Sequence, residues 1–78
     1  MSVKEEIIKI MTEVLEVEES TLDEDTAIGD IPEWDSLHHL NIISTIENRF
    51  GIQFTPDILM DLEDVSDIVK ATEDRVKK

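Results

Sequence analysis

The sequence predicts an all-α fold, namely a small four-helix bundle with three main helices, a short third helix and a long loop between the first and second helices. Three observations support this prediction. Apolar residues recur every three or four positions in three segments, which is the period of an amphipathic helix. Serine, aspartate, proline and glycine stand at the ends of these segments, where helices start and stop. No segment has the composition and alternation of a convincing strand.

The first helix is expected over roughly residues 3–16. Ser2 precedes Glu5 by three positions, which is the spacing of a capping box at a helix start. The apolar residues that follow at helical spacing are Ile7, Ile8, Ile10, Met11, Val14 and Leu15. They predict a helix with one apolar face.

The segment 16–30 is expected to be a long, acidic and irregular loop. Its apolar anchors are Leu22, Ala27 and Ile28. A loop this long in so small a chain is often functional, or is held in place by a few buried side chains.

The second helix is expected to begin at Asp35 or Ser36. It should end at Gly51, because glycine is the favoured residue just beyond a helix. Its apolar stripe consists of Leu37, Leu40, Ile42, Ile43, Ile46 and Phe50. The stripe indicates that one face of this helix packs against the rest of the bundle.

Two shorter elements complete the predicted bundle. After an extended connection at 52–54, Thr55-Pro56 opens a short helical turn, because proline is favoured at the first helical position. The last helix is expected to start at Asp64 or Ser66. Its stripe consists of Val65, Ile68, Val69, Thr72 and Val76. Lys77 and Lys78 lie near its C-terminal end, where the helix dipole favours cations.

The composition limits the possible partners and compartments. Twenty acidic residues face seven basic ones, so the formal net charge is −13. Such a surface repels nucleic acids and anionic lipids and favours partners with basic docking patches. No apolar run is long enough for stable membrane insertion, and the absence of cysteine fits a reducing compartment. The length of 78 residues predicts one domain over residues 1–78, which we expect to be a monomer. The N-terminal stretch is too charged for a secretory signal, so we expect the protein in the cytoplasm.

Ser36 is the candidate functional residue because it stands at the start of an amphipathic helix. A helix N-terminus presents unpaired N–H groups and a partial positive charge, so a phosphate on this hydroxyl would be stabilised. Asp35 places a carboxylate beside it, and Leu37 is an apolar neighbour that packs on a partner or supports the turn. The simpler interpretation is that Asp35 and Ser36 only cap the helix, since both residue types are favoured there.

Catalytic and metal sites find less support in the sequence. Ser36 lacks the glycine elbow of a serine hydrolase. His38 and His39 are adjacent, so on a helix they point in different directions and are expected to be solvated rather than to share a metal. The stretch from Asp23 resembles a calcium loop only superficially, because Ile28 takes the place of the required glycine. We therefore expect no catalytic residue and no metal site.

Trp34, just before the candidate site, has two possible roles. It can pack over the helix entrance as a hydrophobic staple. It can instead face a partner, because tryptophan is a frequent interface anchor.

Taken together, these features resemble an acyl carrier protein of the phosphopantetheine-binding carrier protein family. The resemblance covers nearly the whole chain. It depends on Asp35-Ser36-Leu37 opening the second of three main helices after the long loop. The stripe ending in Phe50-Gly51-Ile52 and the short helix before Val65-Ser66-Asp67-Ile68-Val69 make it more specific.

The resemblance implies that a phosphopantetheinyl transferase attaches 4′-phosphopantetheine to Ser36, in a cofactor site shared with Asp35 and Leu37. The thiol of this arm would carry acyl or aminoacyl groups as thioesters to loading and transferring enzymes. The carrier would not itself be an enzyme. The alternative is a noncovalent acidic helical adaptor in which Ser36 is only a helix cap.

The resemblance also suggests which residues line the bundle and which meet partner enzymes. The expected bundle lining is Ile28, Ile42, Ile43, Ile46, Phe50, Phe54, Leu62 and Ile68. The expected partner-binding residues are Leu37, His38, Asn41 and Glu47. Only Glu47 is acidic on the exposed face of the second helix, whereas carriers of fatty-acid synthesis usually have several acids there. A specialised lipid, polyketide or nonribosomal peptide pathway is therefore favoured.

Overall fold

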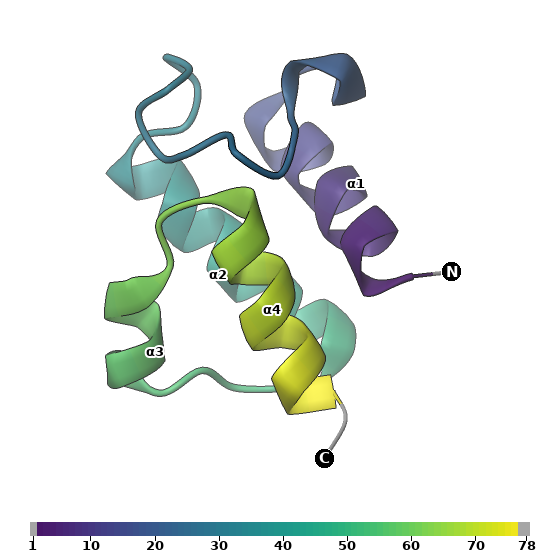
Figure 1. Cartoon of the computed structure of the whole chain (residues 1–78), viewed down its shortest axis with the longest axis vertical. Helices are drawn as coiled ribbons and strands as arrows, with labels where there is room; N and C mark the ends of the chain where they lie inside the picture. Colours follow the sequence, from purple (N-terminus) through teal and green to yellow (C-terminus); the bar gives the residue numbers. More distant parts are fainter. Residues whose placement is uncertain (1, 77–78) are drawn as a thin grey trace.

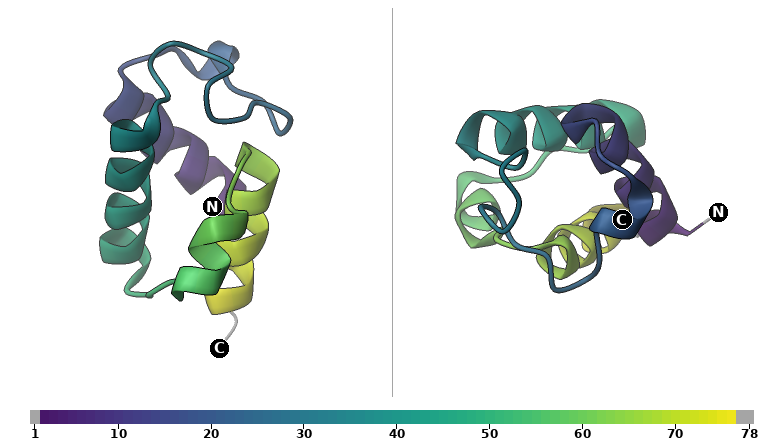
Figure 2. Two further views of the ribbon diagram at one scale, coloured as in Figure 1. Left: turned by 90° about the vertical axis from the view of Figure 1, so that its left-hand side faces the viewer. Right: turned by 90° about the horizontal axis from the view of Figure 1, so that it is seen from above.

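The computed structural model describes residues 2–76, which form four α-helices and one short 3-10 turn. The α-helices are α1 (Val3–Leu15), α2 (Ser36–Phe50), α3 (Pro56–Asp61) and α4 (Val65–Val76), and the 3-10 turn η1 spans Glu19–Thr21. α1 packs against both α2 and α4 (Figure 1). Seen from above, the four helices surround a common core, with α3 between α2 and α4 (Figure 2). The predicted all-α bundle is confirmed.

None of the helices among residues 2–76 is long and apolar enough to cross a membrane.

The ends of the helices follow the local signals in the sequence. The Ser2 hydroxyl oxygen accepts the Glu5 N–H and lies 3.1 Å from the Glu5 carboxylate, so the predicted capping pair starts α1. α1 ends at Leu15, one residue earlier than expected, because Glu16 adopts a left-handed conformation with φ 55°. Gly51 ends α2 in the same conformation, which glycine adopts without strain.

The loop between α1 and α2 is more regular than the sequence suggested. It crosses the end of the bundle at which α2 and α4 begin (Figure 1). Three main-chain hydrogen bonds tie it to the α3–α4 connection and to the first residues of α4. They run from Ile28 N–H to Glu63 C=O (2.8 Å), from Val65 N–H to Thr26 C=O (3.0 Å) and from Ser66 N–H to Glu24 C=O (3.1 Å). Two of the expected anchors, Ala27 and Ile28, are only partly buried, whereas Leu22 and Thr26 are buried.

The start of α4 lies between the two expected positions. The Asp64 carboxylate accepts the N–H of Asp67 at 2.8 Å, as an N-cap residue does, and the helix begins at Val65. The main-chain bonds to Glu24 and Thr26 fasten this helix start to the middle of the α1–α2 loop. Lys77 and Lys78 lie outside the described residues.

The core agrees largely with the expected lining. Six of its eight expected residues are buried: Ile42, Ile43, Ile46, Phe54, Leu62 and Ile68. The other two, Ile28 and Phe50, are partly buried and pack against this core. Ile28 lies in the loop and Phe50 is the last residue of α2. Helix α1 supplies five more buried residues: Ile7, Ile8, Ile10, Met11 and Leu15.

Truncation of a core isoleucine tests this packing. Ile46 is fully buried, so Ile46→Ala removes apolar contacts and leaves a cavity, and we expect the free energy of unfolding to fall by about 2–5 kcal/mol. Met60 is 81% exposed, so Met60→Ala should change it by less than about 0.5 kcal/mol. Urea unfolding followed by circular dichroism measures both. Equal effects for the two variants would contradict the assigned core.

Candidate functional site

Ser36 is the first residue of α2, and its side chain is exposed. The cap of this helix belongs to its neighbour, because Asp35 Oδ1 accepts the N–H of His38 at 2.9 Å. The interpretation of Ser36 as the cap is therefore wrong. Within residues 2–76 the Ser36 hydroxyl has no hydrogen-bond partner, and neither do the N–H groups of Ser36 and Leu37.

These groups make the start of α2 suitable for a phosphate ester. The exposed hydroxyl can react without breaking an internal hydrogen bond. The two N–H groups and the positive end of the helix dipole would then face the negative phosphate. The geometry of Ser36 thus fits a phosphate-linked prosthetic group.

Asp35 is held in its ionised form beside this site. The hydrogen bonds from the His38 backbone N–H and from the His38 side chain lower the pKa of the Asp35 carboxyl group below its usual value of 3.8. His38 Nδ1 lies 2.8 Å from Asp35 Oδ1. Because a carboxylate can only accept, His38 carries a proton on Nδ1.

Trp34 packs over the entrance of α2. Its side chain is fully buried, and its ring stacks on that of His39 with centroids 5.9 Å apart and an interplanar angle of 28°. Trp34 precedes the cap residue and His39 is the fourth residue of the helix, which are the two positions of a hydrophobic staple. The staple interpretation of Trp34 is confirmed, and its burial contradicts the role of an exposed interface anchor.

His39 was not expected to belong to this arrangement. The sequence correctly indicated that the two histidines point apart, since His38 contacts Asp35 and His39 contacts Trp34. The prediction that both are solvated was wrong for His39, which is partly buried and accepts the indole N–H of Trp34 at Nδ1 over 3.0 Å. Burial lowers the pKa of His39 below 6.5. The five-residue spacing from tryptophan to histidine was the only signal of this pair.

The expected partner-binding residues differ in their solvent exposure and in their internal hydrogen bonds. Leu37 is 66% exposed and Asn41 is exposed. His38 is partly buried and bonded to Asp35, and the partly buried Glu47 carboxylate accepts the N–H of Phe54 at 2.8 Å.

One further residue joins this face of α2. Leu40 is 63% exposed and follows Leu37 by three positions, so both leucines lie on the same side of the helix. The charged residues of α2 are Glu47 and Arg49, and both make internal contacts, with the Arg49 guanidinium 3.7 Å from the Glu6 carboxylate. The exposed residues that follow Ser36 in the first half of α2, namely Leu37, Leu40 and Asn41, therefore carry no charge and include two large apolar side chains.

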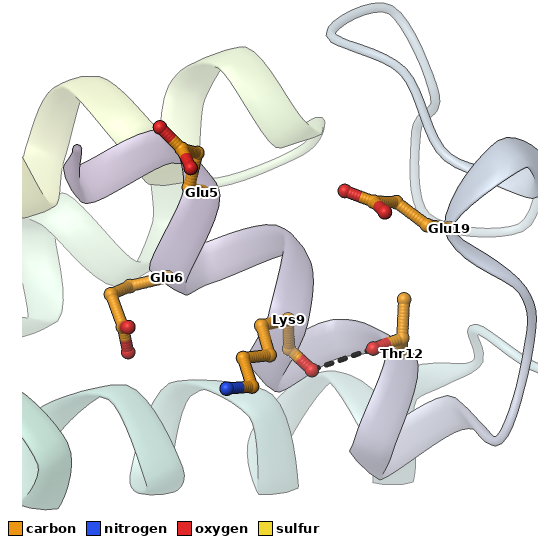
Figure 3. A pocket seen from close by; sticks show the side chains of 5 residues that line it. All are labelled: Glu5, Glu6, Lys9, Thr12 and Glu19. Carbon is orange, nitrogen blue, oxygen red and sulfur yellow. Dashed lines mark hydrogen bonds between the residues drawn. The ribbon is translucent and has the colours of Figure 1, made fainter. Parts of the chain in front are cut away.

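A shallow groove runs along this face between α2 and α3. The lining residues are His39, Leu40, Ile43, Ser44, Glu47 and Leu59. A second pocket lies elsewhere, between α1 and η1, and is lined by Glu5, Glu6, Lys9, Thr12 and Glu19 (Figure 3). It contains none of the expected site residues. Among residues 2–76 no group of histidine and acidic side chains is arranged to hold a metal ion.

Comparison with known proteins relates this geometry to a family. The family model described as "Phosphopantetheine attachment site" matches residues 5–72. Among solved structures, the holo acyl carrier protein from Geobacter metallireducens, determined by solution NMR, matches with a TM-score of 0.87 and 27% sequence identity. The match covers 99% of this chain and 88% of that one. No match was found among curated proteins.

The separate roles of Asp35 and Ser36 can be tested by stability. Asp35→Ala removes the acceptor for the His38 N–H, so we expect Tm to fall by several degrees. Ser36→Ala removes a hydroxyl without an internal partner and should change the free energy of unfolding by less than about 0.5 kcal/mol. Thermal unfolding followed by circular dichroism compares them. A larger loss for Ser36→Ala than for Asp35→Ala would restore the capping interpretation of Ser36.

Proposed function

Because this chain belongs to the phosphopantetheine-binding carrier protein family, we propose that Ser36 is the residue to which 4′-phosphopantetheine is attached. The observation that carries the proposal is the exposed, unbonded hydroxyl of Ser36 at the first position of α2. Asp35 supports it by providing the cap, which leaves the hydroxyl available for a transferase. Leu37, the next residue, completes the Asp-Ser-Leu motif and is exposed beside it.

The prosthetic group supplies what the chain lacks. It ends in a thiol that holds acyl groups as thioesters, and this chain contains no cysteine. The flexible arm keeps its cargo at high effective concentration near the enzymes that the carrier meets. Its chemistry is done by those enzymes, so we propose an acyl or aminoacyl carrier that is not itself a catalyst.

The noncovalent adaptor is the less favoured alternative. It assigned Ser36 to helix capping, and that role belongs to Asp35. It also leaves unexplained why the hydroxyl is exposed at the centre of a region matched by the phosphopantetheine attachment model.

We propose two groups of partners, a phosphopantetheinyl transferase and the enzymes that load and unload the arm. Both must reach Ser36, so both must approach the neighbouring part of α2. Leu37 and Asn41 are exposed there. His38 and Glu47 are partly buried on the same surface and are already hydrogen-bonded, to Asp35 and to the Phe54 N–H. This uncharged face supports a specialised lipid, polyketide or nonribosomal peptide pathway rather than the general fatty-acid machinery.

The extent and setting of the carrier are part of the same proposal. The family model covers most of residues 1–78, which supports a single carrier domain over that range. We place it in the cytoplasm as a monomer. Cell fractionation and light scattering test these two points.

Attachment is tested by intact mass. After incubation with coenzyme A, magnesium and a broad-specificity phosphopantetheinyl transferase, the chain should gain the mass of one phosphopantetheinyl group. Ser36→Ala, which keeps the cap on Asp35, should gain nothing, and Ser44→Ala, altered at another exposed serine of α2, should react like the parent chain. An unmodified parent chain that is folded and initially free of the group would refute the proposal.

The role of the apolar face is tested by kinetics. Leu37 is largely exposed, so Leu37→Ala should leave the free energy of unfolding within about 0.5 kcal/mol of the parent value. The KM of the transferase for the carrier should rise roughly three- to tenfold, the loss typical of one apolar contact in an interface. Asn48→Ala, an exposed change farther along α2, serves as the matched control. An unchanged KM for Leu37→Ala would remove this residue from the interface.

A further inference from the structure

We propose that His39 is a positioning residue for the attachment reaction at Ser36: by accepting the indole N–H of Trp34, it fixes the segment that leads into α2. This inference rests on the proposed function of Ser36. His39 has no part in the chemistry of attachment. It acts through Trp34 on the place and orientation of Asp35 and Ser36.

The contacts of Trp34 make it the link between loop and helix. On the loop side, its C=O accepts the N–H of Gly29 at 2.9 Å, and its N–H donates to Ile31 C=O at 3.2 Å. On the helix side, its indole N–H donates to His39 Nδ1 at 3.0 Å. The side chain is fully buried, so it cannot exchange this partner for water without moving.

Ser36 lies inside the segment that this link closes. It is two residues after Trp34 and three before His39, so the ring contact closes a short loop around Asp35 and Ser36. Within that loop the His39 N–H donates to Asp35 C=O at 2.8 Å, which forms the first turn of α2. Loss of the indole bond would let the residues that lead into this turn, Trp34 to Ser36, move, while the rest of α2 remained helical.

The bond requires a neutral imidazole. An indole N–H can only donate, so His39 Nδ1 must present a lone pair and its proton must be on Nε2. A protonated ring has donors at both nitrogens and cannot accept. The position of His39 in the first turn also disfavours a positive charge, because the helix dipole is positive there.

The surroundings of His39 offer little to stabilise the charged form. Trp34 from the loop and Leu59 from α3 are uncharged, and the two acids of α3, Asp57 and Asp61, do not line the groove at His39. On α2 itself, Glu47 lines the same groove, but its carboxylate is bonded to a backbone N–H. The Asp35 carboxylate contacts His38.

The consequence is a defined dependence on pH. Burial places the pKa of His39 in the folded chain below 6.5, its value when exposed. Above pH 6.5 the ring is neutral in both states, and the Trp34 bond is fully present. As the pH falls below 6.5 and through the lower pKa of the folded chain, the ring takes up a proton and the bond is lost.

The test compares the attachment rate of four chains between pH 7.5 and 5.0. His39→Gln supplies a carbonyl acceptor that does not titrate, and His39→Phe keeps an aromatic ring without an acceptor. Asn48→Ala, an exposed change farther along α2, is the control. Because the transferase has its own pH dependence, each rate is divided by that of His39→Gln at the same pH.

For the parent chain, this ratio of kcat/KM should be near one at pH 7.5 and fall roughly three- to tenfold at low pH, mainly through KM, as expected for the loss of one hydrogen bond. His39→Phe should be reduced by a similar factor at every pH. Asn48→Ala should follow the parent chain. Circular dichroism at each pH confirms that the chains are folded.

The NMR signal of the Trp34 indole N–H is a readout independent of attachment. In the parent chain it should shift with the same midpoint as the rate ratio, and in His39→Gln it should stay constant over this range. Parallel pH profiles for the parent chain and His39→Gln, together with full activity of His39→Phe, would overturn the positioning role. If no chain is modified at any pH, the assignment of Ser36 is wrong, and the positioning role of His39 is wrong as well. The indole signal would still show whether the Trp34–His39 hydrogen bond exists.

Discussion

The first backbone N–H groups of a helix need acceptors, and the way α2 meets this need determines the rest of the site. Asp35 supplies the acceptor from the residue before the helix. Ser36 is thereby released from a task that serine often performs. A reactive hydroxyl at this position would otherwise be occupied by the N–H groups that it caps. Asp35 thus serves the fold, and the Ser36 hydroxyl is left available for the modification that we propose.

The position of this helix start depends in turn on the loop before it. Main-chain hydrogen bonds fasten the loop to the α3–α4 connection, and the buried ring of Trp34 fastens its end to α2. The attachment end of the molecule is therefore built by segments far apart in the sequence. With few residues available for a core, these directional contacts hold the loop where apolar packing alone would be weak.

Much of this arrangement was predictable, and the exceptions have physical causes. Helical periodicity located the main helices, and the Pro56 and Gly51 signals located boundaries, because these depend on local structure. The bonds from the loop to the α3–α4 connection join main-chain groups, which carry no signal in the side-chain pattern. The candidate serine could be located from its position and motif, whereas the pairing of Trp34 with His39 required the three-dimensional path of the chain.

The separation of capping from attachment also bears on competition among carriers. A chain that lacks only the Ser36 hydroxyl would retain its cap and its exposed Leu37 and Leu40. To an enzyme that recognises the face of α2 it would look like a normal carrier, yet, if Ser36 holds the prosthetic group as proposed, it could deliver nothing. Such a chain would act as a decoy, occupying partner enzymes in proportion to its abundance. Under the proposed function, loss of this one atom would therefore interfere with the intact protein in addition to abolishing delivery by the altered chain.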